Sequence, residues 1–164
     1  MMKKYLLILL MLTGGYVHGQ SVTFNDLTNL AHLSNQEAYN YLTQARSFKR
    51  DYNMKNTSGM QMEGYKRTTP DFKWETVMVG DGTKLDNGAL LRNVYYTSNN
   101  KQHILGLVTQ AGKAGLKLSF KGLDADKNIF IFDSDLYNVS INLNIYNGAG
   151  SVTIKQKEVA GIEY

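Results

Sequence analysis

The sequence contains no cysteine and a single proline, Pro70. Without cysteine the chain can form no disulfide, and it cannot carry the lipid that bacterial lipoproteins attach to a cysteine at their cleavage site. The folded part must therefore be stabilised by hydrophobic burial alone. A chain of this size buries about two-thirds of the surface that its unfolded form exposes. That is enough for one domain, or for two small halves that share a core.

A strong charge of either sign is also missing. The chain has 18 Lys and Arg against 14 Asp and Glu, a net charge of +4, and loss of Lys3 and Lys4 in an N-terminal segment would lower it to +2. A balance this mild argues against nucleic acid or an anionic membrane as the partner.

Long apolar runs are absent except near the start. A basic stretch, Met1 to Lys4, is followed by an apolar run at 5–12 and by small and polar residues up to Gly19. This order is typical of a secretory signal peptide. Eight apolar residues are too few for a membrane span, which needs about 20. We therefore expect cleavage near Gly19 and a soluble exported protein, periplasmic or extracellular, with no membrane span and no lipid anchor.

Two helices are expected at the beginning of the mature chain. Apolar residues recur every three positions from Phe24 to Leu33, which places them on one side of a helix that Asn25 can cap. Ser34 and Glu37 then have the spacing of a capping box, in which each side chain hydrogen bonds to the other's backbone N–H. This pattern predicts a second helix over residues 35–48.

Alternating apolar residues predict an antiparallel sheet in the rest of the chain. The clearest strand is 137–145, where Tyr137 to Ile145 place apolar side chains on one face and Asn or Ser on the other. Such alternation indicates a sheet covered on one side only. Turns are expected at the Gly-Asp-Gly of 80–82 and the Asp-Asn-Gly of 86–88. Further strands are expected within 52–66, 72–79, 90–97, 116–120, 129–132 and 151–157.

A short repeat suggests that this pattern occurs twice. Thr-Gln-Ala at 43–45 recurs at 109–111, in each case near the end of a predicted helix that precedes strands. We therefore expect an α+β fold of two tandem repeats, each with helices followed by antiparallel strands, and with the helices packed on one face of the sheet. The expected division is a signal peptide at 1–19, a first repeat at 20–98, a second at 99–157 and a tail at 158–164.

In this order of elements the chain resembles small secreted proteins of Bacteroidetes-type bacteria with tandem helix-plus-sheet repeats. It is similar to the β-lactamase-inhibitor-protein fold and to outer-membrane lipoproteins of the SmpA/OmlA type. The resemblance rests on the helical start at 24–48, the repeated Thr-Gln-Ala and the closing hairpin at 137–157. It implies a binding or scaffold role. The chain differs in lacking the disulfides of the inhibitor and the lipidated cysteine of the lipoproteins.

No motif in the sequence predicts catalysis. There is no Gly-x-Ser-x-Gly, no phosphate-binding loop and no dinucleotide fingerprint. We expect no cofactor. A zinc site would need His32, His103 and carboxylates together, and we interpret these histidines as ordinary helix residues. A weak calcium-loop pattern is interpreted as a hairpin turn, because Ile129 stands where the loop needs glycine; its candidate ligands are Asp124, Asp126, Asn128 and Asp135.

Aromatic residues offer the other candidate site. Trp74, Tyr65, Tyr95 and Tyr96 lie in or beside the strands of the first half. They can pack between the helices and the sheet, or they can form an exposed contact surface on the open sheet face. Both interpretations are open at this stage.

Three functional hypotheses follow. The first is a non-catalytic interaction protein that binds another protein through its open sheet face, with an inhibitor or immunity protein as one concrete form. The second is a small-molecule or glycan binder with a pocket of convergent polar groups. The third is a small hydrolase with a dispersed carboxylate pair.

Overall fold

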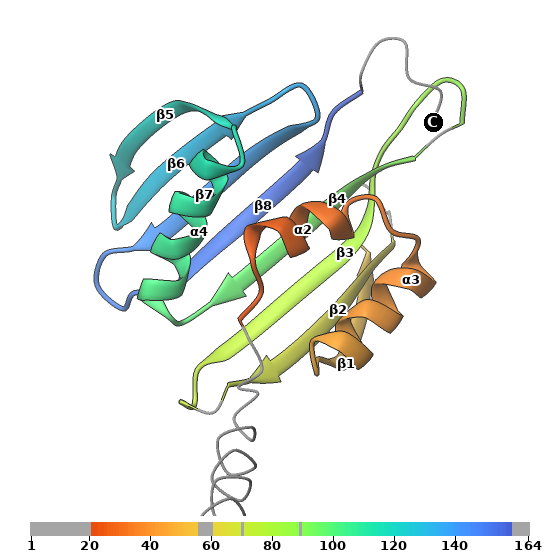
Figure 1. The fold of residues 1–164 in the computed structure, drawn as a ribbon, viewed down its shortest axis with the longest axis horizontal. Helices are drawn as coiled ribbons and strands as arrows, with labels where there is room; N and C mark the ends of the chain where they lie inside the picture. Colours follow the sequence, from red (N-terminus) through yellow and green to blue (C-terminus); the bar gives the residue numbers. More distant parts are fainter. Residues whose placement is uncertain (1–20, 56–60, 70, 89, 159–164) are drawn as a thin grey trace, which may run out of the picture.

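The described part of the protein folds into one eight-stranded antiparallel sheet with three α-helices against it (Figure 1). The computed structural model describes residues 21–55, 61–69, 71–88 and 90–158. The predicted signal peptide and residues 159–164 of the predicted tail lie outside this part. The helices are α2 (Phe24–Leu30), α3 (Asn35–Asn40) and α4 (Lys101–Lys113), with a π-helical turn η1 (Tyr41–Ala45). The strands are β1 (Lys49–Lys55), β2 (Gln61–Thr68), β3 (Trp74–Lys84), β4 (Leu90–Ser98), β5 (Lys117–Asp124), β6 (Lys127–Asp133), β7 (Tyr137–Asn144) and β8 (Gly150–Gln156).

The strand order is β1-β2-β3-β4-β8-β7-β6-β5. Strands β1 to β4 form one meander, β5 to β8 form another, and the last strands of the two meanders pair at the centre of the sheet. We call this β4–β8 pairing the central seam; it runs from Asn93 opposite Lys155 to Ser98 opposite Gly150. The predicted α+β class with an antiparallel sheet is confirmed. The two-repeat organisation and its helix packing stay predictions.

One face of the sheet supplies the core. In β7 the side chains of Tyr137, Val139, Ile141 and Leu143 are buried, as the alternation predicted, whereas Ile145 follows the end of the strand and is exposed. Figure 1 shows α2, α3 and α4 on the same side of the sheet. Among the described residues no helix has the length and apolar character needed to cross a bilayer. Helix and strand residues share a single core cluster, which includes Leu27, Leu30, Leu42, Ile104, Leu107, Val77, Val94, Tyr96, Val152 and Ile154.

Side-chain caps fix where the helices begin. The predicted capping box of Ser34 and Glu37 is confirmed at the start of α3. The prediction that Asn25 caps the first helix is wrong, because Thr23 holds that position and forms a capping box with Asp26. The second helix is shorter than predicted. It passes into η1 and ends before Phe48, whose backbone N–H donates to the carbonyl of Leu42 at 2.9 Å.

The turn predicted at 80–82 is wrong, because these residues lie inside β3. A side chain at Gly80 would place its Cβ 2.2 Å from the carbonyl oxygen of Gln61 in β2. The glycine therefore permits a close approach of two strands, which is its other common use. The predicted turn at 86–88 is confirmed, and Gly88 has a φ of 87°.

Candidate functional site

The sheet face opposite the helices carries one continuous row of residues across all eight strands. The register pairs each member of the row with the next, so their side chains point the same way. We call it the cross-sheet row, and it consists of Tyr52, Gly64, Met78, Tyr95, Thr153, Ser140, Ile131 and Phe120.

Each end of the cross-sheet row carries an exposed aromatic ring beside a glycine. Tyr52 is 46% exposed, and its ring atoms lie 3.2 Å from where a Cβ of Gly64 would stand. Its hydroxyl donates to the Met78 Sδ at 3.4 Å. Phe120 is 50% exposed and covers Gly122 in the same way, at 2.5 Å. The two rings therefore lie flat against the sheet, and the centre of the row is formed by hydroxyl groups.

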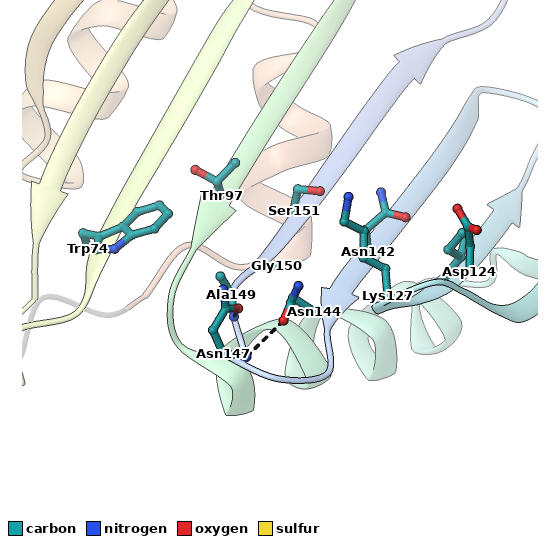
Figure 2. Close-up of a pocket in the computed structure, with 11 residues that line it drawn as sticks. Trp74, Thr97, Asp124, Lys127, Asn142, Asn144, Asn147, Ala149, Gly150 and Ser151 are labelled. Atoms are coloured by element: carbon teal, nitrogen blue, oxygen red, sulfur yellow. Dashed lines mark hydrogen bonds between the residues drawn. The ribbon is translucent and has the colours of Figure 1, made fainter.

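A hollow of about 470 Å³ opens on the same face, next to the cross-sheet row (Figure 2). Trp74 at the start of β3 stands at one end, and Asp124 with Lys127 of the β5–β6 hairpin stands at the other. Five strand spacings separate β3 from β5, so the hollow spans about 24 Å across the sheet. Its lining between the two ends is Thr97, Ile129, Asn142, Asn144, Asn147, Ala149, Gly150 and Ser151.

Hydrogen bonds hold part of this lining in place. The Asn144 amide donates to Asp126 Oδ2 at 2.5 Å, and its Oδ1 accepts the backbone N–H groups of Tyr146 and Asn147 at 2.9 and 3.0 Å. Asn144 thus ties the β7–β8 turn to the β5–β6 hairpin. The middle of the hollow presents neutral hydroxyl and amide groups, and charge is confined to the Asp124 and Lys127 end. Such a surface suits hydrogen bonding to an uncharged polar ligand or to a protein surface.

The four predicted binding aromatics divide between the two faces of the sheet. Trp74 is 42% exposed and lines the hollow, and the half-buried Tyr95 belongs to the cross-sheet row. Tyr65 and Tyr96 lie on the helix side and are 1% and 0% exposed. The core interpretation therefore describes Tyr65 and Tyr96, whose rings are too deeply buried in the folded protein to contact another molecule.

A buried ionic cluster lies on the helix side, and sequence reasoning missed it. Arg67 Nε donates to Glu75 Oε2 at 2.6 Å, with side chains 7% and 1% exposed. His103 Nε2 lies 4.0 Å from the other carboxylate oxygen, and its ring packs edge-on against Tyr96. Burial lowers the pKa of His103, although the charge of Glu75 opposes this shift. Arg67 and Glu75 come from neighbouring strands, whereas His103 comes from a helix farther along the chain, so no local motif marks the cluster.

A second ionic group fixes α2 to η1. Arg46 Nη2 and the Tyr41 hydroxyl donate to Asp26 Oδ1 at 2.6 and 2.5 Å. Burial alone would raise the pKa of Asp26, but the hydrogen bonds from Tyr41 and Thr23 and the charge of Arg46 outweigh it and hold the pKa below its usual range. Both ionic groups face the core side and join elements of the fold.

The residues of the calcium-loop pattern lie in a β-hairpin. Asp124 ends β5 opposite Lys127, and Ala125 with Asp126 forms the turn between them, with Ala125 at a φ of 47°. Asn128 lies within β6, and Asp135 follows that strand. Within the described ranges, no three acidic, histidine or cysteine side chains gather closely enough to hold a metal ion. His32 contacts the Tyr137 hydroxyl by a hydrogen bond and is remote in the chain from His103.

Comparison with known proteins adds no relative to this description. The resemblance to inhibitor and SmpA/OmlA folds stays a prediction, since no protein-family model, no curated protein and no solved structure matches the chain.

Proposed function

We propose that the chain is a non-catalytic binding protein that contacts another protein through the sheet face bearing the cross-sheet row. The observation that carries the proposal is the row itself, which spans eight strands and ends in the exposed rings of Tyr52 and Phe120. Exposed aromatic side chains are enriched in protein contact surfaces. An inhibitor or immunity role is one concrete form of this function.

The distribution of ionisable groups supports a binding role over a catalytic one. The Arg67, Glu75 and His103 side chains are buried beneath the helices and connect β2, β3 and α4. The lining of the hollow includes one carboxylate, Asp124, so the described residues there do not supply the carboxylate pair of a glycosidase.

A pair of arginine substitutions tests the protein-binding proposal. Thr153→Arg puts a long cationic side chain at the centre of the cross-sheet row, and Thr109→Arg puts the same side chain on the exposed surface of α4. A partner captured from the exported fraction and then purified should bind the Thr153→Arg protein at least about tenfold more weakly. The Thr109→Arg protein should bind like the wild type. Equal binding by all three proteins would contradict the proposed surface.

A glycan ligand is the second candidate, and the hollow favours it. Trp74 offers an apolar ring face at one end, and Thr97, Ser151 and Asn142 offer neutral hydrogen-bonding groups beside it. Sugars present apolar C–H faces and dense hydroxyl groups, which match this combination. A span of about 24 Å would accommodate several sugar units.

The chain has a single tryptophan, so its fluorescence reports on the hollow directly. Titration with cellohexaose and with the hexamer of N-acetylglucosamine should shift the emission of Trp74 if a glycan occupies the hollow. Asn142→Leu should abolish the shift, whereas Asn138→Leu, on the same face of β7 but outside the lining, should preserve it. Unchanged emission at millimolar sugar would contradict this candidate.

We further infer that the protein is exported and that its two halves arose by duplication. Export is supported by the residue order at 1–19 and predicts that the secreted protein begins at Gln20 in N-terminal sequencing. Duplication is supported by a shared contact: Thr43 Oγ1 donates to the carbonyl of Tyr39 at 2.7 Å, and Thr109 Oγ1 donates to that of Leu105 at 3.2 Å. Each threonine precedes the first strand of its meander, and both meanders place their last strand at the central seam.

A further inference from the structure

Strand β5 forms one edge of the sheet and leaves large apolar side chains exposed on both of its faces. Leu118, Phe120 and Leu123 are 45%, 50% and 65% exposed. Leu118 and Leu123 point to the helix side, because their partners lie opposite buried residues of the core, but α4 packs over β4, β6, β7 and β8. An edge strand offers a row of backbone N–H and C=O groups to any further strand.

The sequence of β5 is complementary to itself in the antiparallel direction. If β5 pairs side by side and antiparallel with β5 of a second copy over its full length, Lys117 lies opposite Asp124 of the second copy, and Leu118 lies opposite Leu123. Both pairs occur twice because the arrangement has a twofold axis. Opposite charges and apolar pairs directly across two strands stabilise their pairing.

The irregularity of β5 fits the same register. The shift between Leu118 and Phe120 in the pairing with β6 leaves Ser119 as an extra residue. We place Ser119 in a β-bulge in both copies. Every pair of opposite residues then points to the same face of the joined sheet, and Phe120 lies opposite Gly122 of the second copy. Gly122 adds no side chain there, so it does not displace the Phe120 ring, which within each chain already covers Gly122.

One pair in this register is repulsive. Lys121 lies on the twofold axis and meets its own copy, and like charges directly opposite destabilise strand pairing. Its ammonium lies 5.8 Å from the centre of the Phe130 ring in the same chain, which draws it toward β6 and away from the edge.

The other edge strand lacks this complementarity. End-to-end pairing of β1 with its copy would place Lys49 opposite Lys55, and Arg50 opposite Met54. From this contrast we propose that the protein forms a twofold homodimer in which the β5 edges pair and join the two sheets into one. The dimer uses the edge of the sheet. It shares Phe120 with the cross-sheet row and Asp124 with the hollow, and the rest of the proposed binding face lies outside the contact.

Charge exchange tests the dimer by sedimentation equilibrium of the purified protein in low salt, where exposed charge pairs are least screened. Lys117→Asp and Asp124→Lys should each weaken the dimer at least about tenfold, because each places like charges opposite one another twice. The double exchange should restore the affinity to within about threefold of the wild type. Circular dichroism of each variant checks that it folds.

The double exchange separates dimer contacts from contacts inside one chain. Within the chain, Lys117 lies opposite Asp133 and Asp124 lies opposite Lys127. If the charges act only inside one chain, both pairs become repulsive in the double variant, and it should form the weakest dimer of the three variants. Lys121→Gln should tighten the dimer, whereas Lys55→Gln on the β1 edge should not. A monomer at every concentration up to about 0.5 mM, a double variant no better than the single ones, or a dimer unaffected by Lys117→Asp would each overturn the proposal.

Discussion

Replacing Glu75 by glutamine tests how much the buried ionic cluster contributes to stability. The change keeps the shape of the side chain and removes its charge, which leaves the guanidinium of Arg67 buried without its carboxylate. Breaking a buried ion pair in this way costs about 3–5 kcal/mol. The contacts that Arg67 keeps include a hydrogen bond to the carbonyl of Arg46 at 2.7 Å and the Phe48 ring at 4.6 Å. We therefore expect a loss near the lower end, about 3 kcal/mol.

The neighbouring residue on β2 supplies a matched control. Lys66 points to the opposite face and pairs with Asp51 at 2.5 Å, but the two side chains are 58% and 25% exposed. Asp51→Asn should therefore cost about 1 kcal/mol or less. The two pairs have nearly the same length, so the comparison isolates burial from distance.

Urea denaturation followed by circular dichroism measures both losses. With a urea dependence of about 2 kcal/mol per molar, Glu75→Gln should lower the midpoint by about 1.5 M and Asp51→Asn by at most about 0.5 M. Equal midpoints for the two variants would refute the reasoning, since burial would then add nothing to the energy of the pair.

Three further changes have definite directions. His103 has a lowered pKa in the folded state, so the unfolded chain binds a proton first and stability falls as pH drops below about 6.5; His103→Gln should remove that part of the decline between pH 7.5 and 5.5, which unfolding at both pH values measures. Gly80→Ala should cost more than about 2 kcal/mol, because its Cβ meets the carbonyl of Gln61, and an unchanged melting temperature would contradict this. Gly106→Ala in α4 should stabilise by about 0.5–1 kcal/mol in the same melting assay, because a Cβ there meets nothing within 4 Å.

Features that depend on neighbouring residues were predictable from the sequence. The alternation in β7, the capping box at Ser34 and the turn at Gly88 each follow from a few adjacent side chains. The Gly-Asp-Gly of β3 led to a wrong prediction of a turn, because glycine serves both in turns and where two strands approach closely. The close approach of β2 to Gly80 and of β4 to Gly82 distinguishes the two uses, and neither approach is visible in the local sequence.

The candidate site required the register, which no local pattern contains. Tyr95 and Tyr96 are adjacent, yet Tyr95 lies on the open sheet face and Tyr96 has 0% exposure in the core. Residues 94, 96 and 98 are buried, and this period of two places Tyr95 and Tyr96 on opposite faces of β4. Tyr52 and Phe120 lie at opposite ends of one row because the central seam joins the two meanders into a single sheet. Its six inner strands connect β1 to β5.

The central seam also has a consequence for how the chain folds. The β2–β3 pairing joins residues 6 to 18 positions apart, from Thr68–Trp74 to Met62–Gly80, whereas the seam joins residues 52 to 62 positions apart, from Ser98–Gly150 to Asn93–Lys155. Closing the longer loop costs about 1 kcal/mol more in chain entropy. Each meander should therefore assemble early and the seam should close last. Until the seam closes, β4 and β8 are open edges. The β4 edge of one molecule can then pair with the β8 edge of another. The last step of folding is therefore also the step at which two chains can exchange halves.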